Sequence, residues 1–194
     1  SKAKELNLRF EADSKDSEKV LDLIKKKELL GYQYEGAEGS FVLLVEEALN
    51  GRPSFFELGD FRVIIEKETR HGEVISEATL KLLIGKKAVH TVSEGNGPVD
   101  ALDKALRKAL LGFYPELAEM TLMDFKVRVI NAQAGTGARV RVLVTSKDAM
   151  EEWGTIGVSE NIIEASWQAL VDAVDYKLLK CKRNAPKLPF KKRG

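Results

Sequence analysis

The peptide Asp-Phe-Arg-Val at residues 60–63 returns as Asp-Phe-Lys-Val at residues 124–127. The same offset, from position 60 to position 124, relates six further pairs of equal or similar residues: Thr91 and Thr155, Val92 and Ile156, Val99 and Ile163, Ala101 and Ala165, Ala105 and Ala169, and Leu106 and Leu170. Because this single repeat offset relates both ends of the segment, the sequence predicts a structural unit that occurs twice.

The hydrophobic pattern inside each copy predicts three strands followed by one helix. The predicted strands cover about 60–69, 76–84 and 86–93 in the first copy and 122–131, 138–146 and 151–157 in the second, with helices at 98–111 and 161–180. Turn residues at 70–73 and 134–137 favour hairpins. The expected fold class is α+β, with two βββα repeats, each a three-stranded antiparallel sheet covered by one helix. Because such a unit is small, we expect the two units to pack together and to form a homodimer.

Residues 1–58 are predicted to form a helical connector that is separate from the repeats. An apolar stripe predicts a helix over about 18–30, with Ser17 as its cap and Gly31 at its end. A second helix is expected over 37–49. The repeats would then occupy residues 59–181, at about 60–116 and 121–181, and residues 182–194 would form a basic flexible tail.

The composition is typical of a folded protein with little catalytic equipment. Of the 194 residues, 44% are hydrophobic, which is enough to bury a core. No run of residues reaches the length of a membrane span, and residues 1–6 lack the apolar region of a signal peptide, so we expect a cytoplasmic protein. The sequence has one cysteine, Cys181, which excludes a disulfide framework within the chain. Its only histidines are His71 and His90, so few side chains could form a zinc-type metal centre. We therefore expect no catalytic residue, metal or cofactor in this chain.

The charge is distributed unevenly along the chain. The net charge is +1, yet residues 177–194 contain eight Lys or Arg residues and no Asp or Glu, which leaves residues 1–176 at about −7. Such a basic end can bind nucleic acid, so a free-standing RNA-binding α+β module is an alternative. The acidic body and the lack of a row of exposed aromatic residues on the predicted strands argue against it. We therefore expect neither a nucleic-acid nor a membrane partner.

The turn at residues 93–98, Ser-Glu-Gly-Asn-Gly-Pro, leads from a predicted strand directly into a predicted helix. Free backbone N–H groups and the positive end of the helix dipole make this turn a seat for a carboxylate or phosphate. A second interpretation is that Gly95 and Gly97 supply only the positive φ angles that a tight connection needs. The corresponding turn at 157–161 lacks the paired glycines, so we expect the two repeats to differ in ligand binding.

Several segments carry a resemblance to a known family. Residues 95–101 (Gly-Asn-Gly-Pro-Val-Asp-Ala), residues 153–166 (beginning Trp-Gly-Thr-Ile-Gly-Val) and the paired βββα pattern resemble the C-terminal regulatory domain of the 2-isopropylmalate synthase and citramalate synthase family. Residues 31–41 are similar to the helical connector of the citramalate synthase branch. The resemblance in the repeats covers about residues 60–180.

This resemblance implies that the chain is a piece of a larger enzyme. In the family, a TIM barrel upstream of the connector is an acyltransferase that condenses acetyl-CoA with a 2-oxo acid, pyruvate in the citramalate branch, at a divalent metal. No barrel is present here, so we expect the chain to be inactive alone. Its implied role is allosteric feedback inhibition, in which the end-product amino acid binds at the homodimer interface and acts on the barrel through the connector. The expected effector is isoleucine; leucine, sensed by 2-isopropylmalate synthases, is the alternative.

The resemblance also implies an effector site. Its residues would be Gly95, Asn96, Gly97, Val99, Asp100, Leu122, Phe125, Val129, Ala134 and Gly135. The turn would hold the charged groups of the amino acid, while Leu122, Phe125 and Val129 would form an apolar pocket for its branched side chain.

Overall fold

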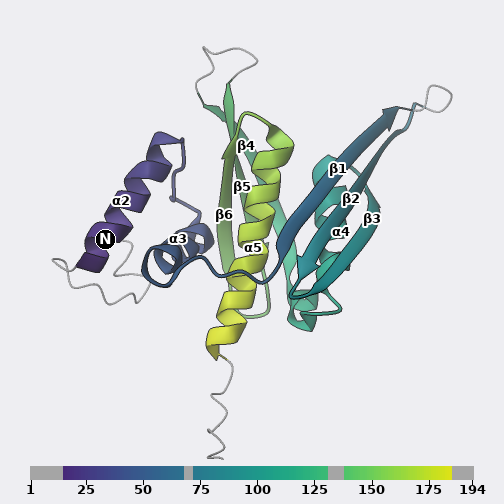
Figure 1. Cartoon of the computed structure of the whole chain (residues 1–194). Helices are drawn as coiled ribbons and strands as arrows, with labels where there is room; N and C mark the ends of the chain where they lie inside the picture. Colours follow the sequence, from purple (N-terminus) through teal and green to yellow (C-terminus); the bar gives the residue numbers. More distant parts are fainter. Residues whose placement is uncertain (1–14, 68–71, 131–137, 185–194) are drawn as a thin grey trace, which may run out of the picture.

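The chain folds into a helical connector followed by two βββα repeats (Figure 1). The structure is a computed structural model that describes residues 15–67, 72–130 and 138–184. Its elements are α2 (Lys15–Leu29), α3 (Glu38–Asn50), β1 (Glu57–Lys67), β2 (Val74–Ile84), β3 (Lys87–Gly95), α4 (Pro98–Leu110), the short 3-10 helix η1 (Pro115–Glu119), β4 (Thr121–Ile130), β5 (Arg139–Lys147), β6 (Glu152–Ser159) and α5 (Ile162–Asn184). The predicted α+β class and the repeated order of elements are confirmed.

Each repeat forms its own antiparallel sheet, in the order β1-β2-β3 and β4-β5-β6. Helix α4 packs on the first sheet and α5 on the second, and the two helices contact each other. Side chains from both repeats join in one continuous hydrophobic core. Figure 1 shows α5 between the two sheets, with the connector helices beyond the second sheet. None of the described helices combines the length and apolar character needed to cross a membrane.

The two repeats share structural details at equivalent positions. The first hairpin of each repeat has a register shift at the same place, between Leu58 and Asp60 in one and between Leu122 and Asp124 in the other. Thr91 and Thr155, which correspond at the repeat offset, form equivalent hydrogen bonds. The Thr91 hydroxyl donates a hydrogen bond to the Ala105 carbonyl at 2.9 Å, and the Thr155 hydroxyl donates to the Ala169 carbonyl at 2.8 Å. Each threonine therefore ties the third strand of its sheet to the helix that covers it.

Alternation along the central strands places the core. In β2 the buried side chains face α4, while the intervening side chains point to the opposite, outer face of the sheet. The equivalent inward residues of β5 are also buried: Ala78, Leu80 and Leu82 correspond to Val142, Val144 and Ser146.

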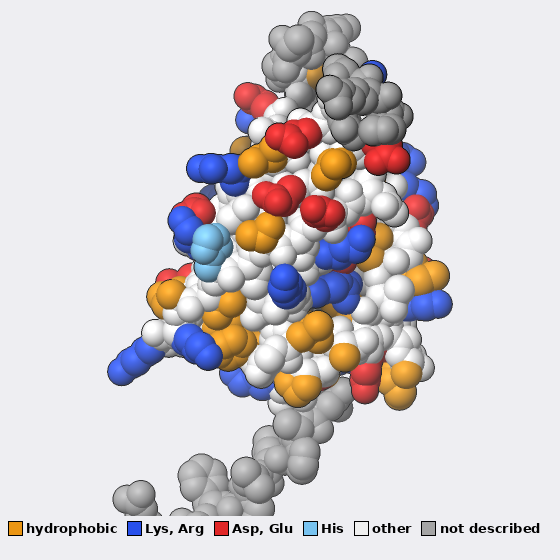
Figure 2. Space-filling view, turned by 90° about the vertical axis from the view of Figure 1, so that its right-hand side faces the viewer, with side chains coloured by type: hydrophobic (Ala, Val, Ile, Leu, Met, Phe, Trp, Pro, Cys, Tyr) orange, Lys and Arg blue, Asp and Glu red, His pale blue; other side chains and the backbone are white. Residues whose placement is uncertain are grey.

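The outer surface of the first repeat is mixed in character. Figure 2 views the molecule from the side on which the first sheet lies, and the hydrophobic side chains on this face are scattered among charged ones.

Two local expectations differ from the structure. Helix α2 begins at Lys15, so Ser17 lies inside its first turn instead of capping it. Helix α5 continues beyond the predicted end at residue 180 to Asn184, with Lys182 and Arg183 in its last turn, where cations interact favourably with the helix dipole. Of the two expected hairpin turns, residues 70–71 and all of 134–137 lie outside the described residues, and these include His71, Ala134 and Gly135.

The connector is docked along β6, the edge strand of the second sheet. Helix α3 contacts both β6 and α5, and Ala37 packs with Ile156 and Val158 of β6. The backbones approach so closely that a Cβ atom on Gly154 would lie 1.8 Å from the Gly36 carbonyl oxygen. Only glycine fits at position 154 without displacing the connector.

Arginines and buried carboxylates also fasten the connector. The Arg52 Nη2 atom contacts Asp172 at 2.7 Å and Asp175 at 3.0 Å, both on α5. The Ser40 hydroxyl donates to Asp172 at 2.5 Å and accepts the Ile156 N–H at 2.9 Å. From β5, Arg141 donates to the Gly31 carbonyl, where the chain leaves α2. Polar contacts therefore hold both connector helices to the second repeat.

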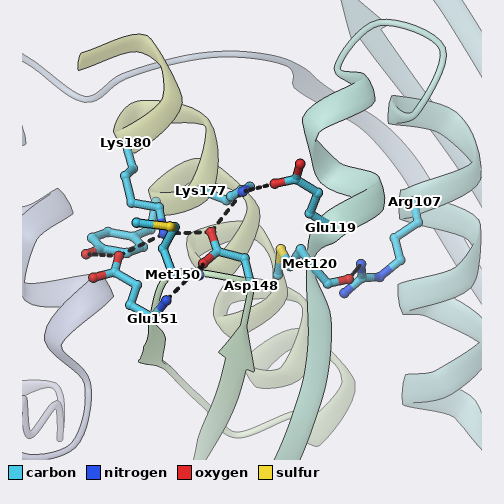
Figure 3. A network of polar contacts seen from close by, with 9 residues as sticks. Arg107, Glu119, Met120, Asp148, Met150, Glu151, Lys177 and Lys180 are labelled. Carbon is cyan, nitrogen blue, oxygen red and sulfur yellow. Dashed lines mark hydrogen bonds and ion pairs between the residues drawn. The ribbon is translucent and has the colours of Figure 1, made fainter. Parts of the chain in front are cut away.

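A second polar network fixes the far end of α5 (Figure 3). The Asp148 carboxylate accepts hydrogen bonds from Lys177 and Lys180, each at 2.8 Å, and from the backbone N–H groups of Met150 and Glu151. Burial raises the pKa of Asp148, but these hydrogen bonds outweigh burial and hold it well below its usual range. Lys177 also bonds Glu119 at 3.2 Å, which joins α5 to the start of β4 through η1.

The paired threonines generate a prediction. Thr155→Val and Thr91→Val keep the shape of the side chain but remove the hydroxyl donor to the helix carbonyl, so each should lower the free energy of unfolding by about 1 kcal/mol. Thr79→Val is the matched control, because the Thr79 side chain points to the outer face and its hydroxyl has no hydrogen-bond partner among the described residues. Urea denaturation of the three variants checks this. Equal losses in all three would show that the two hydroxyl bonds have no special role.

The Arg52 network predicts a pH dependence of stability. Burial raises the pKa of Asp175 to about 7, although Arg52 opposes the rise. Because the folded state holds this proton more tightly than the unfolded state, stability should fall as the pH rises through 7, by about 1.4 kcal/mol between pH 6 and pH 8. Asp175→Asn should flatten this part of the curve, whereas Asp22→Asn, at an exposed ion pair on α2, should not. Denaturation at several pH values tests this, and an unchanged slope in Asp175→Asn would contradict it.

Candidate functional site

The glycine turn connects β3 to the first turn of α4. Gly97 is the N-cap residue in an extended conformation, and Pro98 is the first residue of the helix. The Asn96 N–H donates to the Asp100 carboxylate at 2.9 Å, and Lys104 contacts the same oxygen at 2.8 Å. Burial raises the pKa of Asp100, but the hydrogen bonds from Lys104 and Asn96 lower it by more than burial raises it. The pKa of Asp100 therefore lies below its usual value. One N–H group of the predicted anion seat is therefore already bonded to a carboxylate of the chain itself.

The two glycines of the turn have different structural roles. A Cβ atom on Gly95 would lie 2.3 Å from the Ala101 nitrogen, so glycine is required there because the turn packs against the helix backbone. Around Gly97, no atom of the described residues lies within 4 Å of such a Cβ, and its φ of −172° suits any residue. Neither glycine has a positive φ. The interpretation that both glycines supply positive φ angles is therefore wrong.

A groove of about 530 Å³ lies between α4 of the first repeat and the start of β4 of the second. Its lining consists of Val99, Asp100, Asp103, Arg107, Met120, Thr121, Leu122 and Phe125. The fold thus brings four predicted site residues to one groove: Val99 and Asp100 on the helix, and Leu122 and Phe125 on the strand. Residues from the two repeats face each other across it.

A charged pair lies on the helix side of the groove. Arg107 Nε bonds the Asp103 carboxylate at 2.8 Å, and Arg107 Nη1 donates to the Met120 carbonyl at 2.6 Å, so the arginine ties α4 to the residue before β4. Its Nη2 atom is buried and has no hydrogen-bond partner among the described residues. Burial raises the pKa of Asp103, and Arg107 only partly offsets this rise. Figure 3 shows Arg107 pointing toward Met120.

The other predicted residues lie beside the groove or outside the described residues. Asn96 adjoins the groove through its hydrogen bond to Asp100. Val129 is on the same face of β4 as Phe125 but farther along the strand, where its side chain is 59% exposed, and it does not line the groove. Ala134 and Gly135 lie outside the described residues, so their place relative to the groove stays a prediction.

Sequence reasoning missed half of the groove lining: Asp103, Arg107, Met120 and Thr121. A pair of opposite charges one helical turn apart resembles an ordinary solvated ion pair. A signal was nevertheless present, because the repeat offset places Asp103 opposite Trp167 and Arg107 opposite Val171. A charged pair in one repeat where the other repeat has apolar residues indicates an altered surface.

The groove has the chemistry of a binding site for a small amphiphilic molecule. Phe125, Leu122 and Val99 provide apolar contacts, and Asp103, Arg107 and the turn provide charged or polar ones. The place of His90 on a predicted strand, between Val89 and Thr91, favours a hydrogen-bonded structural histidine over a catalytic one. This prediction is wrong, because His90 is exposed and its side chain forms no hydrogen bond within the described part of the chain. Within residues 15–67, 72–130 and 138–184 there is no group of three His, Cys, Asp or Glu residues that could hold a metal ion.

Comparisons with known proteins identify a family and several related enzymes. Residues 35–178 match the family described as the LeuA allosteric (dimerisation) domain. An (R)-citramalate synthase of Geobacter sulfurreducens is 51% identical over 180 residues, which are 93% of this chain and 34% of that protein. For an (R)-citramalate synthase of Aquifex aeolicus the identity is 48% over 179 residues, 92% of this chain and 34% of the relative.

A second branch also matches, less closely. A 2-isopropylmalate synthase of Aquifex aeolicus is 36% identical over 102 residues, 53% of this chain and 18% of that protein. The chain spans about a third of the length of the citramalate synthases that it matches. The match over most of the chain, together with the two βββα repeats, shows that the chain belongs to the LeuA allosteric (dimerisation) domain family.

Proposed function

We propose that this chain is the feedback-regulatory part of an (R)-citramalate synthase and that it binds isoleucine in the groove between α4 and β4. The observation that carries the proposal is the gathering of Val99, Asp100, Leu122 and Phe125, from two repeats, in one groove next to the glycine turn. The citramalate synthases that match over more than nine-tenths of this chain support the choice of parent enzyme. That enzyme is proposed to be an acyltransferase of branched-chain amino acid biosynthesis.

The groove suits an aliphatic amino acid in chemistry as well as in place. The branched side chain would pack against Phe125 and Leu122, and the apolar area removed from water would favour binding by about 25 cal/mol per Å². The carboxylate would lie toward the turn, where the start of α4 favours negative charge. The choice between isoleucine and leucine depends on the position of one methyl group, which is worth only about 1–3 kcal/mol. Leucine therefore remains the alternative effector, with 2-isopropylmalate synthase as the parent.

We propose a homodimer because apolar side chains beside the groove are left uncovered. Helix α5 covers β5 and β6 more fully than β4, and on the inner face of β4 Val127 is 39% exposed and Val129 is 59% exposed. The equivalent strand of the first repeat carries Ile65, which is 58% exposed. A second copy of the chain packed on these strands would bury this surface and close the groove. The family description, a dimerisation domain, supports this proposal.

The docked connector offers a route for the regulatory signal. A ligand that binds one arrangement of the two repeats more tightly than another would shift the equilibrium toward that arrangement and so move α5. The connector would move with α5, because Arg52 and Ser40 fasten it to this helix. The connector would pass this shift to the catalytic barrel of the parent enzyme. The family match favours such a regulatory role over an RNA-binding module, for which no specific observation speaks.

Titration of the purified fragment tests the proposal. Isoleucine, leucine and valine would be titrated by calorimetry, with the mass measured by light scattering in the same buffer. We expect saturable binding of isoleucine to a dimer, weaker binding of leucine and still weaker binding of valine. Preference for leucine would assign the chain to the sister enzyme, and a folded dimer that binds none of the three would contradict the proposed effector.

Gly97→Val tests the place of the site. The space around Gly97 is open and its backbone is extended, so the variant should fold, but its side chain would crowd a ligand at the turn. We expect isoleucine affinity to fall about tenfold or more, with the mass of the dimer unchanged. Gly112→Val is the matched control, because a Cβ atom there also has no described neighbour within 4 Å. Unchanged affinity in Gly97→Val would place the effector elsewhere.

A further inference from the structure

At the repeat offset, the counterpart of the open groove is the seam between α5 and the start of β1, which we call the second groove. At the repeat offset, the lining of the open groove corresponds to a second set on α5 and at the start of β1: Val99 to Ile163, Asp100 to Glu164, Asp103 to Trp167, Arg107 to Val171, Met120 to Phe56, Thr121 to Glu57, Leu122 to Leu58 and Phe125 to Phe61. The aromatic residue on the strand, Phe125 or Phe61, is the same in both. The central helix residue differs most, because Asp103 is replaced by Trp167.

Trp167 fills the second groove. Its side chain is only 6% exposed, and its ring lies 5.6 Å from the ring of Phe61 at an interplanar angle of 37°. Val171, one helical turn later, takes the place of Arg107 and leaves the indole without a charged neighbour at that position. In the first groove the shorter, charged Asp103 and Arg107 pair with each other, and the corresponding space beside Phe125 stays open.

We infer that Trp167 is a built-in plug of the second groove. Its indole packs against Phe61 in the way that the apolar side chain of a ligand would pack against Phe125 in the open groove. Each chain then carries one working groove and one closed duplicate. Naming the ligand as an aliphatic amino acid rests on the proposed function, but the plug itself rests only on the comparison of the two repeats.

The same comparison assigns a role to the charged pair. One oxygen of Asp103 accepts the bond from Arg107, and its other oxygen has no hydrogen-bond partner among the described residues. Asp103 lines the groove at the position where the closed duplicate has an indole, so this oxygen can accept a hydrogen bond from the ammonium group of a ligand bound there. Arg107 is a positioning residue, because its bonds to Asp103 and to the Met120 carbonyl hold the carboxylate and the two walls of the groove in place.

Grafting the plug into the open groove is the decisive experiment. The double variant Asp103→Trp, Arg107→Val gives the first repeat the residue pair of the second. We expect a folded protein whose new indole emits at short wavelength and resists quenching by acrylamide, whose melting temperature without ligand is higher than that of the wild type, and whose response to isoleucine is lost. Asp103→Asn is the matched control, because it keeps the shape at position 103: it should weaken isoleucine binding without raising the melting temperature.

The reverse change tests the closed groove. Trp167→Ala should open a cavity beside Phe61, and free indole should bind there and recover most of the melting temperature lost, whereas indole should not stabilise the wild type. If Trp167→Ala does not fold, the double variant still decides. A double variant with a solvent-exposed new indole, no gain in melting temperature and an unchanged isoleucine response would overturn the inference. If wild type binds no amino acid, the proposed function fails, while the indole rescue and the burial of the grafted tryptophan still test the plug.

Discussion

The structure depends on a core that neither repeat can complete alone. A three-stranded sheet with one helix buries little apolar surface, and helices α4 and α5 contact each other so that Leu102, Leu106 and Leu170 belong to one continuous core. This joining of two units creates the seam at which the start of β4 faces α4. The groove is thus a consequence of the shared core, and its two walls belong to different repeats.

Duplication also relates the two seams to each other, although their linings differ. The repeated fold gives two equivalent seams, and the helix residues at positions 103 and 107 differ in character from their counterparts Trp167 and Val171. Trp167 against Phe61 adds apolar burial and aromatic contact to the second seam. Asp103 with Arg107 leaves the first seam open and charged. The closed seam lies on the side where α5 also holds the connector through Asp172 and Asp175.

The fold was largely predictable because the alternation of the strands and the constant repeat offset can both be read directly from the sequence. The recurrence of Thr91 as Thr155 has a physical reason, because each hydroxyl donates a hydrogen bond from the third strand to the helix. The lining of the candidate groove was predictable only in part. Val99, Asp100, Leu122 and Phe125 lie together, but Asp103 and Arg107 resemble a solvated helical ion pair until the fold places β4 beside them. Glycine is required at position 95 because the turn packs closely against the backbone of α4, and its φ angle is not positive. This requirement depends on the packing of α4, so it cannot be read from the sequence of the turn alone.

We propose that an amino-acid effector binds at the open seam between the repeats. The most direct measurement is a crystal structure of the fragment grown with isoleucine. We predict one isoleucine per chain in the groove between α4 and β4, with its side chain against Phe125, its ammonium group toward Asp103 and a second copy of the chain covering the exposed strand. Isoleucine bound elsewhere, with this groove empty or filled by the chain itself, would contradict the proposed site.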